Sequence, residues 1–202
     1  MKKVSIATIL VIGLVMIFQP LSAVKITAVK IGSKIDVSID GKFFTSYIFS
    51  TNEKYPFFFP VNGPLSEGSV TSMRNDPYPH HASLYFGCDA INGGNYWQEG
   101  LERGRIISVN AEIVKEGGDS VIISDECIWS RPGALSPIKD TRKITITEPS
   151  ATIHQIDFEI TLDMLIDVHF RKTNHSLFSA RMAQRYGGYY LKYKTGVQYI
   201  YL

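Results

Sequence analysis

A strict alternation of apolar and polar side chains near residues 153–162 limits the fold of this chain more than any other feature of its sequence. From residue 156 onward, every second side chain is isoleucine, phenylalanine or leucine, and polar residues stand between them. Successive side chains of a β-strand point to opposite faces, so the pattern predicts an antiparallel strand with one buried and one solvated face. The apolar positions are Ile156, Phe158, Ile160 and Leu162.

Two further pairs of alternating segments flank turn signals and predict β-hairpins. The first turn is Asp40-Gly41, a pair typical of two-residue hairpin loops. The second is Gly117-Gly118-Asp119. The four strands expected around these turns are residues 34–38, 43–49, 104–114 and 121–129.

No segment has the periodicity of a long amphipathic helix, and strand patterns recur along the whole chain. Additional strands are expected over residues 141–147, 168–170 and 177–183. Many short strands separated by turns are typical of a large antiparallel β-sandwich. The sequence therefore predicts an all-β fold with a single domain over residues 24–202.

An aromatic run bracketed by prolines, Tyr55 to Pro60, interrupts the alternating pattern. Proline cannot donate to a strand ladder, so this segment is expected at a sheet edge or in an extended crossover. Its aromatic side chains fit two interpretations equally, as filling of the core or as one wall of a binding cleft.

Residues 1–23 have the features of a secretory signal peptide. Lys2 and Lys3 precede an apolar run that ends before Pro20, and small residues up to Ala23 form the expected cleavage site. An uncleaved membrane anchor is the alternative, although a span requires about 20 apolar residues. We expect a periplasmic or secreted protein without stable membrane insertion after cleavage.

The charge balance favours an uncharged partner. The chain has 21 lysines and arginines and 19 aspartates and glutamates, and removal of Lys2 and Lys3 makes the two numbers equal. A neutral chain without basic runs lacks the electrostatic footprint of a nucleic-acid-binding protein. Carbohydrate, or another polar uncharged small molecule, is the expected ligand. Cys88 and Cys127 fit either one disulfide or two free thiols.

The candidate site lies between Asp76 and Trp97. His80 and His81 follow a stiff Pro-Tyr-Pro segment, and extended backbone would direct their side chains to opposite faces. One imidazole is expected to act as acid or base on a ligand. The alternatives are that the pair only satisfies backbone groups around a turn, or that it binds a metal. No spacing motif ties a third ligand to it, so neither metal nor cofactor is expected.

Amides, a carboxylate and aromatic rings follow the histidines in a combination that suits carbohydrate. Short polar side chains bond sugar hydroxyls, and flat rings stack on the apolar faces of sugars. Asp89 to Gly94 also fits a simple turn in which asparagine and glycine adopt left-handed angles. The residues expected to contact the ligand are Asp89, Asn92, Asn95, Tyr96 and Trp97.

Several of these blocks resemble the bacterial family labelled "methane oxygenase PmoA". The resemblance extends over residues 37–183, and its specific parts are the aromatic-proline block and the double histidine. The blocks that carry it are IDGK at 39–42, YPFFFPV at 55–61, PHH at 79–81, LYFG at 84–87, DAING at 89–93, Trp97, Arg142 with Ile144 and Ile146, and KTNHSLFSARMA at 172–183.

This resemblance implies a galactose-mutarotase-like supersandwich in an exported protein linked to polysaccharide use. It does not imply an oxygenase, because the particulate enzyme is a multi-span copper protein and this chain has one apolar segment. The resembling family commonly has His where Tyr78 stands, Arg for Ala82 and Glu for Asp140. Its members extend further at the C-terminus, so the resemblance implies a truncated, incomplete sandwich.

Three functional hypotheses follow. In the first, the chain is a sugar-active epimerase, lyase or hydrolase in which His80 or His81 is the acid or base and Asp89 its partner, with His175 and Arg181 completing the pocket. In the second, it is a non-catalytic carbohydrate-binding module, or an inactive truncated copy, that uses Tyr85, Tyr96 and Trp97. In the third, it is a structural or protein-interaction sandwich.

Overall fold

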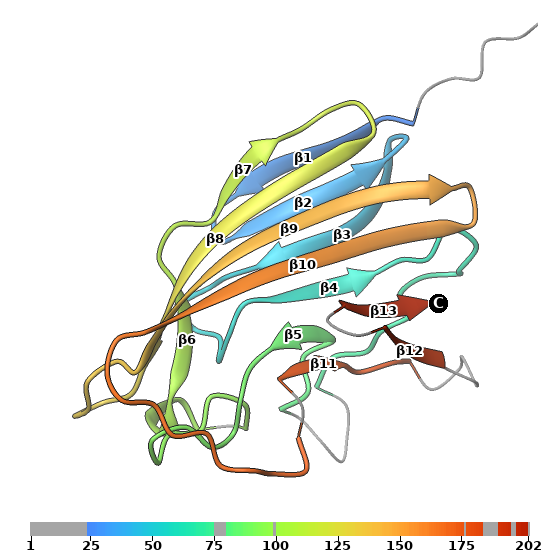
Figure 1. Cartoon of the computed structure of the whole chain (residues 1–202). Coiled ribbons are helices and arrows are strands. Elements are labelled where there is room, and N and C mark those ends of the chain that lie inside the picture. Colours follow the sequence, from blue (N-terminus) through green and yellow to red (C-terminus); the bar gives the residue numbers. More distant parts are fainter. Residues whose placement is uncertain are drawn as a thin grey trace, which may run out of the picture.

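The computed structural model describes residues 24–74, 80–98, 100–175 and 177–183, and the backbone alone of residues 190–194 and 197–201. Two antiparallel sheets pack face to face as an all-β sandwich (Figure 1). The first sheet has the order β1 (Ile26–Ile31), β2 (Lys34–Ile39), β3 (Lys42–Ile48), β4 (Phe57–Val61), β5 (Leu84–Phe86) and β11 (Phe178–Ala180). The second has the order β10 (Ile153–Met164), β9 (Ile138–Ser150), β8 (Ser120–Ser130) and β6 (Arg105–Ser108), with β7 (Glu112–Lys115) also paired to β8.

Three short elements complete the described fold. A single 3-10 turn, η1 (Leu101–Arg103), precedes β6. β12 (Tyr190–Lys194) and β13 (Val197–Tyr201) pair with each other. The predicted signal peptide and Tyr78 lie outside the described residues. None of the helices in the described part of the chain is long and apolar enough to cross a membrane.

The first predicted hairpin is confirmed. β2 and β3 pair antiparallel around Asp40 and Gly41. Both turn residues have positive φ, 47° and 74°, as the two-residue turn favoured by strand twist requires.

The second hairpin is confirmed in part, because residues 104–114 form two strands instead of one. β6 and β7 each pair with β8, and residues 109–111 between them belong to neither strand. Val109 is exposed whereas Ala111 is buried, so the apolar alternation predicted for this segment does not continue through the break.

The prediction for the aromatic run is wrong in one respect, because β4 is a central strand with β3 and β5 on either side. Pro60 has no backbone N–H to donate to the ladder. It is tolerated there because the register between β3 and β4 shifts next to it, so no ladder hydrogen bond from this residue is required. Phe57 and Phe58 are buried, so these two side chains fill the core.

The strand predicted from the strongest alternation is present as β10, but its apolar face is only half-buried. β10 is the edge strand of its sheet, with β9 as its partner. Its apolar side chains therefore have neighbours on fewer sides than those of β9. Residues 168–170 contribute an isolated bridge at Phe170 and no strand, whereas β11 lies within the predicted segment 177–183.

A polar network is buried in the core between the sheets. Arg142 and Asp140 are paired through Nε and Oδ1 at 2.7 Å, and both are almost completely buried. The indole of Trp129 donates to Asp140 Oδ2 at 2.7 Å. Asp125 accepts hydrogen bonds from Tyr47, Ser108 and Cys127. Cys88 and Cys127 are both free thiols, which decides the question left open by the sequence.

Candidate functional site

The predicted site residues gather at the end of the sandwich that β5 and β11 share, low in the view of Figure 1. β11 pairs with β5 so that Phe178 lies opposite Phe86 and Ala180 opposite Leu84. Antiparallel pairing places the segment after one strand beside the segment before the other. His175 therefore lies near the loop after β5, and Arg181 lies near the segment before it.

Local backbone features hold these loops against the strands. The amide of Gly87 donates to Leu177, and that of Arg181 donates to Ser83. A β-carbon at Gly87 would lie 2.8 Å from the carbonyl oxygen of Tyr96, so glycine lets the loop after β5 fold back on the strand.

An aspartate and a histidine form the tightest pair of the site. His175 Nδ1 lies 2.6 Å from Asp89 Oδ2, and the hydroxyl of Thr173 donates to Asp89 Oδ1 at 2.9 Å. Burial acts to raise the pKa of the Asp89 carboxyl, but the hydrogen bonds from His175 and Thr173 outweigh it and hold this pKa below its usual value. Asp89 therefore stays ionised and fixes the orientation of His175. The sequence had assigned Asp89 to His80 or His81, and the structure corrects this partner.

Arg181 lies beside His81, with Nη1 3.3 Å from Nδ1. A guanidinium can only donate, so His81 Nδ1 accepts and the proton of the neutral ring is on Nε2. Burial first, and then the proximity of His80, Arg181 and His175 in that order, lowers the pKa of His81 to about 4. At neutral pH His81 is therefore an uncharged hydrogen-bond donor.

The lowered pKa of His81 predicts a pH-dependent stability. The pKa is about 4 in the folded protein and about 6.5 in an unfolded chain. Below pH 6.5 the unfolded state binds the proton first, so the stabilisation is complete above pH 6.5 and is lost as the pH falls through 4. We expect urea midpoints to decrease over this window, and the decrease to be smaller in His81→Gln. An identical decrease in wild type and variant would contradict the assignment.

His80 and His81 do not point to opposite faces as expected. Their rings contact each other edge to face, with centroids 4.5 Å apart. The segment is turned at His80, so the alternation of an extended strand does not apply there. The carbonyl of His80 accepts a hydrogen bond from the hydroxyl of Tyr55 at 2.7 Å. His80 therefore lies beside His81, and Tyr55 of the aromatic run fixes its backbone.

The aromatic rings predicted to stack on sugar are buried. Tyr85, Tyr96 and Trp97 are 2%, 2% and 5% exposed. The Trp97 ring lies 4.8 Å from His175 and 6.3 Å from His81, between centroids. Tyr85 packs against Trp97, whereas Tyr96 packs on the far side against Trp129. Trp97 therefore supports His81 and His175, and it lines a second pocket together with His80 although little of its surface is exposed.

Asn92 has a structural role and also lines the pocket described below. Its φ is +48°, and with Gly93 it forms the turn that was the alternative interpretation. Its side-chain amide donates to the carbonyl of Asp167, and its Oδ1 accepts from the amide of His169. Asn92 therefore ties the loop after β5 to the loop after β10. Asn95 is likewise engaged, since its Oδ1 accepts from the amides of Trp97 and Gln98.

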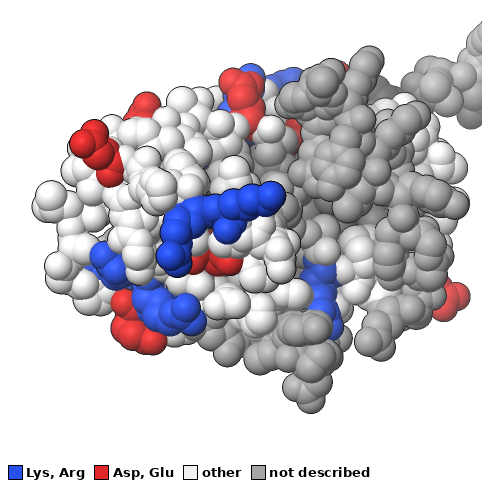
Figure 2. Space-filling model, turned by 60° about the horizontal axis from the view of Figure 1, so that its bottom comes forward, with Lys and Arg blue, Asp and Glu red and all other residues white. Residues whose placement is uncertain are grey.

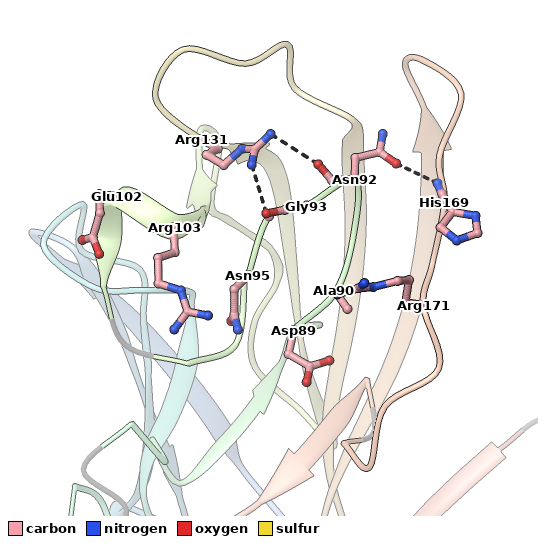
Figure 3. A pocket seen from close by; sticks show the side chains of 11 residues that line it. Asp89, Ala90, Asn92, Gly93, Asn95, Glu102, Arg103, Arg131, His169 and Arg171 are labelled. Atoms are coloured by element: carbon pink, nitrogen blue, oxygen red, sulfur yellow. Dashed lines mark hydrogen bonds between the residues drawn. The ribbon is translucent and has the colours of Figure 1, made fainter.

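An open pocket of about 480 Å³ lies between these loops, with Asp89 in its wall (Figure 3). Arginine residues give it a basic character that the sequence analysis missed, because three separate segments contribute them. In Figure 2, which brings this end of the molecule forward, basic side chains lie around a small acidic group. The charged and titratable lining residues are Asp89, Glu102, Arg103, Arg131, His169 and Arg171.

Thr173 was also missed, although it stands in the segment that carries the resemblance. Its position two residues before His175 lets one hydroxyl serve both Asp89 and the backbone amide of His175. Within the described residues, no group of three or more His, Cys, Asp or Glu side chains is arranged to hold a metal ion.

Fold and site together define a class: an all-β sandwich protein with several histidines and arginines and an aspartate at one end. The model of a family of unknown function (DUF6807) matches residues 34–198, and the chain belongs to this family. No curated protein and no solved structure matches the chain.

Proposed function

We propose that the protein is an exported carbohydrate-active enzyme that transfers a proton to or from a sugar carbon. The observation that carries the proposal is the Asp89–His175 pair together with the His81–Arg181 pair, because both histidines contact one buried ring, that of Trp97. The four polar side chains come from four segments, so their convergence is a property of the fold.

His175 has the geometry of a general base. The carboxylate of Asp89 accepts a hydrogen bond from the N–H at Nδ1 of His175. This leaves the lone pair of the neutral ring on Nε2. A base oriented by a third group is the arrangement that enzymes use to remove protons. The side chain of His175 is 35% exposed, so a substrate can reach it.

His81 is suited to a different role from the acid or base predicted for it. Its Nδ1 faces Arg181, and its ring stays neutral at physiological pH. A neutral imidazole with an Nε2 proton donates a hydrogen bond to an oxygen that gains negative charge. Arg181 adds positive charge beside it. His175 would therefore take the proton while His81 and Arg181 stabilise the resulting anion.

This division of roles favours an epimerase or a lyase over a hydrolase. Glycoside hydrolysis normally uses two carboxylic acids on either side of the scissile bond. The carboxylate of Asp89 bonds His175 and Thr173 through its two oxygens, so it orients the base and is not free to act on a scissile bond. The burial of Tyr85, Tyr96 and Trp97 also counts against a binding module that relies on exposed rings.

The proposal is tested by hydrogen exchange at carbon. Neutral sugars, uronic acids and their oligosaccharides would be incubated with the protein in D2O, and loss of a C–H signal followed by proton NMR. We expect exchange or turnover with one substrate class, reduced about 100- to 10,000-fold in His175→Ala, the range for loss of a general base. Asp89→Asn should reduce it as well, because the amide no longer orients the ring.

Lys172→Ala is the matched control, since this exposed neighbour lies outside the cluster. It should retain wild-type exchange. Activity that persists in His175→Ala would reject the proposed base, and the absence of any reaction across the panel would reject the enzymatic function.

A further inference from the structure

We infer that the arginine-lined pocket beside Asp89 is a subsite for the acidic group of a glycan, a carboxylate or a sulfate ester. The inference rests on the proposed function, because it names the substrate class of the same site. It differs from the uncharged ligand predicted from the sequence. The overall charge of a chain does not reveal a local cluster, and three arginines from separate segments line this pocket.

Two of these arginines are available to a ligand. Arg103 ends η1 and Arg171 follows β10, and both residues are exposed. Figure 3 shows the guanidinium of Arg103 directed toward Asn95 and Asp89, and Arg171 reaching across toward Ala90. Within the described part of the chain, neither guanidinium donates a hydrogen bond to a protein group. Guanidinium groups bind carboxylate and sulfate oxygens with two parallel hydrogen bonds.

The third arginine, Arg131, stabilises the wall of the pocket. Arg131 donates to the carbonyl oxygens of Gly93 and Asn92, at 3.0 and 3.3 Å (Figure 3). Asn92 in turn bonds both Asp167 and His169 across the gap. The turn and the loop that carries Arg171 are thus tied together before any ligand arrives, which reduces the entropy lost on binding.

The acidic residues of the lining do not cancel this charge. Asp89 stays ionised, and with Glu102 it gives two negative charges against the three positive charges of the arginines. Glu102 extends to the opposite side of its turn from the other lining residues, as Figure 3 shows. Arg103 and Arg171 therefore leave a positive potential in the pocket, of the kind that concentrates anions.

The position of the pocket relates it to the proposed base. Asp89 lines the pocket and also bonds His175, so an acidic group held there places the adjoining ring next to His175. The volume of about 480 Å³ is within the usual range of ligand sites. A proton on a carbon next to a carboxylate is also more acidic than other sugar C–H protons, which suits removal by a histidine.

Binding measurements with three polymers test the inference. Polygalacturonate supplies carboxylates, dextran sulfate supplies sulfate esters, and dextran is the neutral control, all at 0.15 M NaCl. We expect one of the acidic polymers to bind at least about tenfold more tightly than dextran, which identifies the acidic group. Arg103→Gln and Arg171→Gln should each weaken that binding about tenfold or more, as expected for loss of a charge-assisted contact. Arg171→Lys should lose part of the affinity, because one ammonium replaces a bidentate group.

Lys42→Gln removes one charge from an exposed position on β3 and is the matched control. Equal affinity for dextran and both acidic polymers would overturn the inference, as would equal weakening by Lys42→Gln and the arginine variants. The His175→Ala result separates the two proposals. Selective acidic binding lost in Arg171→Gln supports the subsite even where His175→Ala leaves exchange unchanged and rejects the proposed base, or where no substrate of the panel reacts.

Discussion

Replacement of Asp140 by alanine is expected to lower the free energy of unfolding by about 3–5 kcal/mol. Asp140 is completely buried, and it accepts hydrogen bonds from Arg142 and from the indole of Trp129. The variant leaves the Arg142 guanidinium, 1% exposed, without its counter-ion in the core. An unpaired buried charge costs far more than the pair contributes when it is intact, which is why a single truncation has so large an effect.

Urea unfolding monitored by circular dichroism measures this change. The double variant Asp140→Leu/Arg142→Met should be considerably more stable than Asp140→Ala, because it removes both charges and fills the space with apolar atoms. Glu126→Ala breaks the exposed pair with Lys139 and should change stability by at most about 1 kcal/mol. If Asp140→Ala were as stable as Glu126→Ala, Arg142 would have to reach solvent when its partner is lost.

The same buried pair explains why one strand was predicted too short. β9 begins at Ile138, but the sequence pattern placed its start near residue 141. Asp140 and Arg142 occupy the inward positions that precede Ile144, and period-two reasoning treats a charged residue as solvated. Most other strands were predicted because their inward positions are apolar. Pro60 misled the placement of β4 for a related reason, since a local register shift removed the conflict that the rule assumes.

Residue types and the resemblance singled out His81, Asp89, His175 and Arg181, but they did not indicate how these side chains pair. Which histidine contacts Asp89 depends on the register of β11 against β5, which follows from packing over the whole sheet. Sequence reasoning also could not distinguish an aromatic ring that faces a ligand from one that supports a site. The pocket arginines carry no spacing signal, because their loops meet only in the folded chain.

Replacement of Trp97 by alanine is expected to lower the free energy of unfolding by about 3–5 kcal/mol, the usual range for a buried indole. The ring is 5% exposed and contacts Tyr85, His81 and His175. Its Nε1 is buried and has no hydrogen-bond partner among the described residues. Trp97→Phe removes this unsatisfied donor together with part of the volume, so its cost should be much smaller, about 1 kcal/mol.

Thermal and urea unfolding of the two variants, measured beside glycan binding, distinguish a supporting ring from a sugar-binding one. Phe43→Ala is the control, because this aromatic ring is 42% exposed and its truncation should cost less than about 1 kcal/mol. In Trp97→Ala we expect the loss of stability to accompany the loss of any activity, since His81 and His175 lose the surface on which they lie. A variant with wild-type stability that loses only glycan affinity would place the ring at the surface and favour the binding-module hypothesis instead.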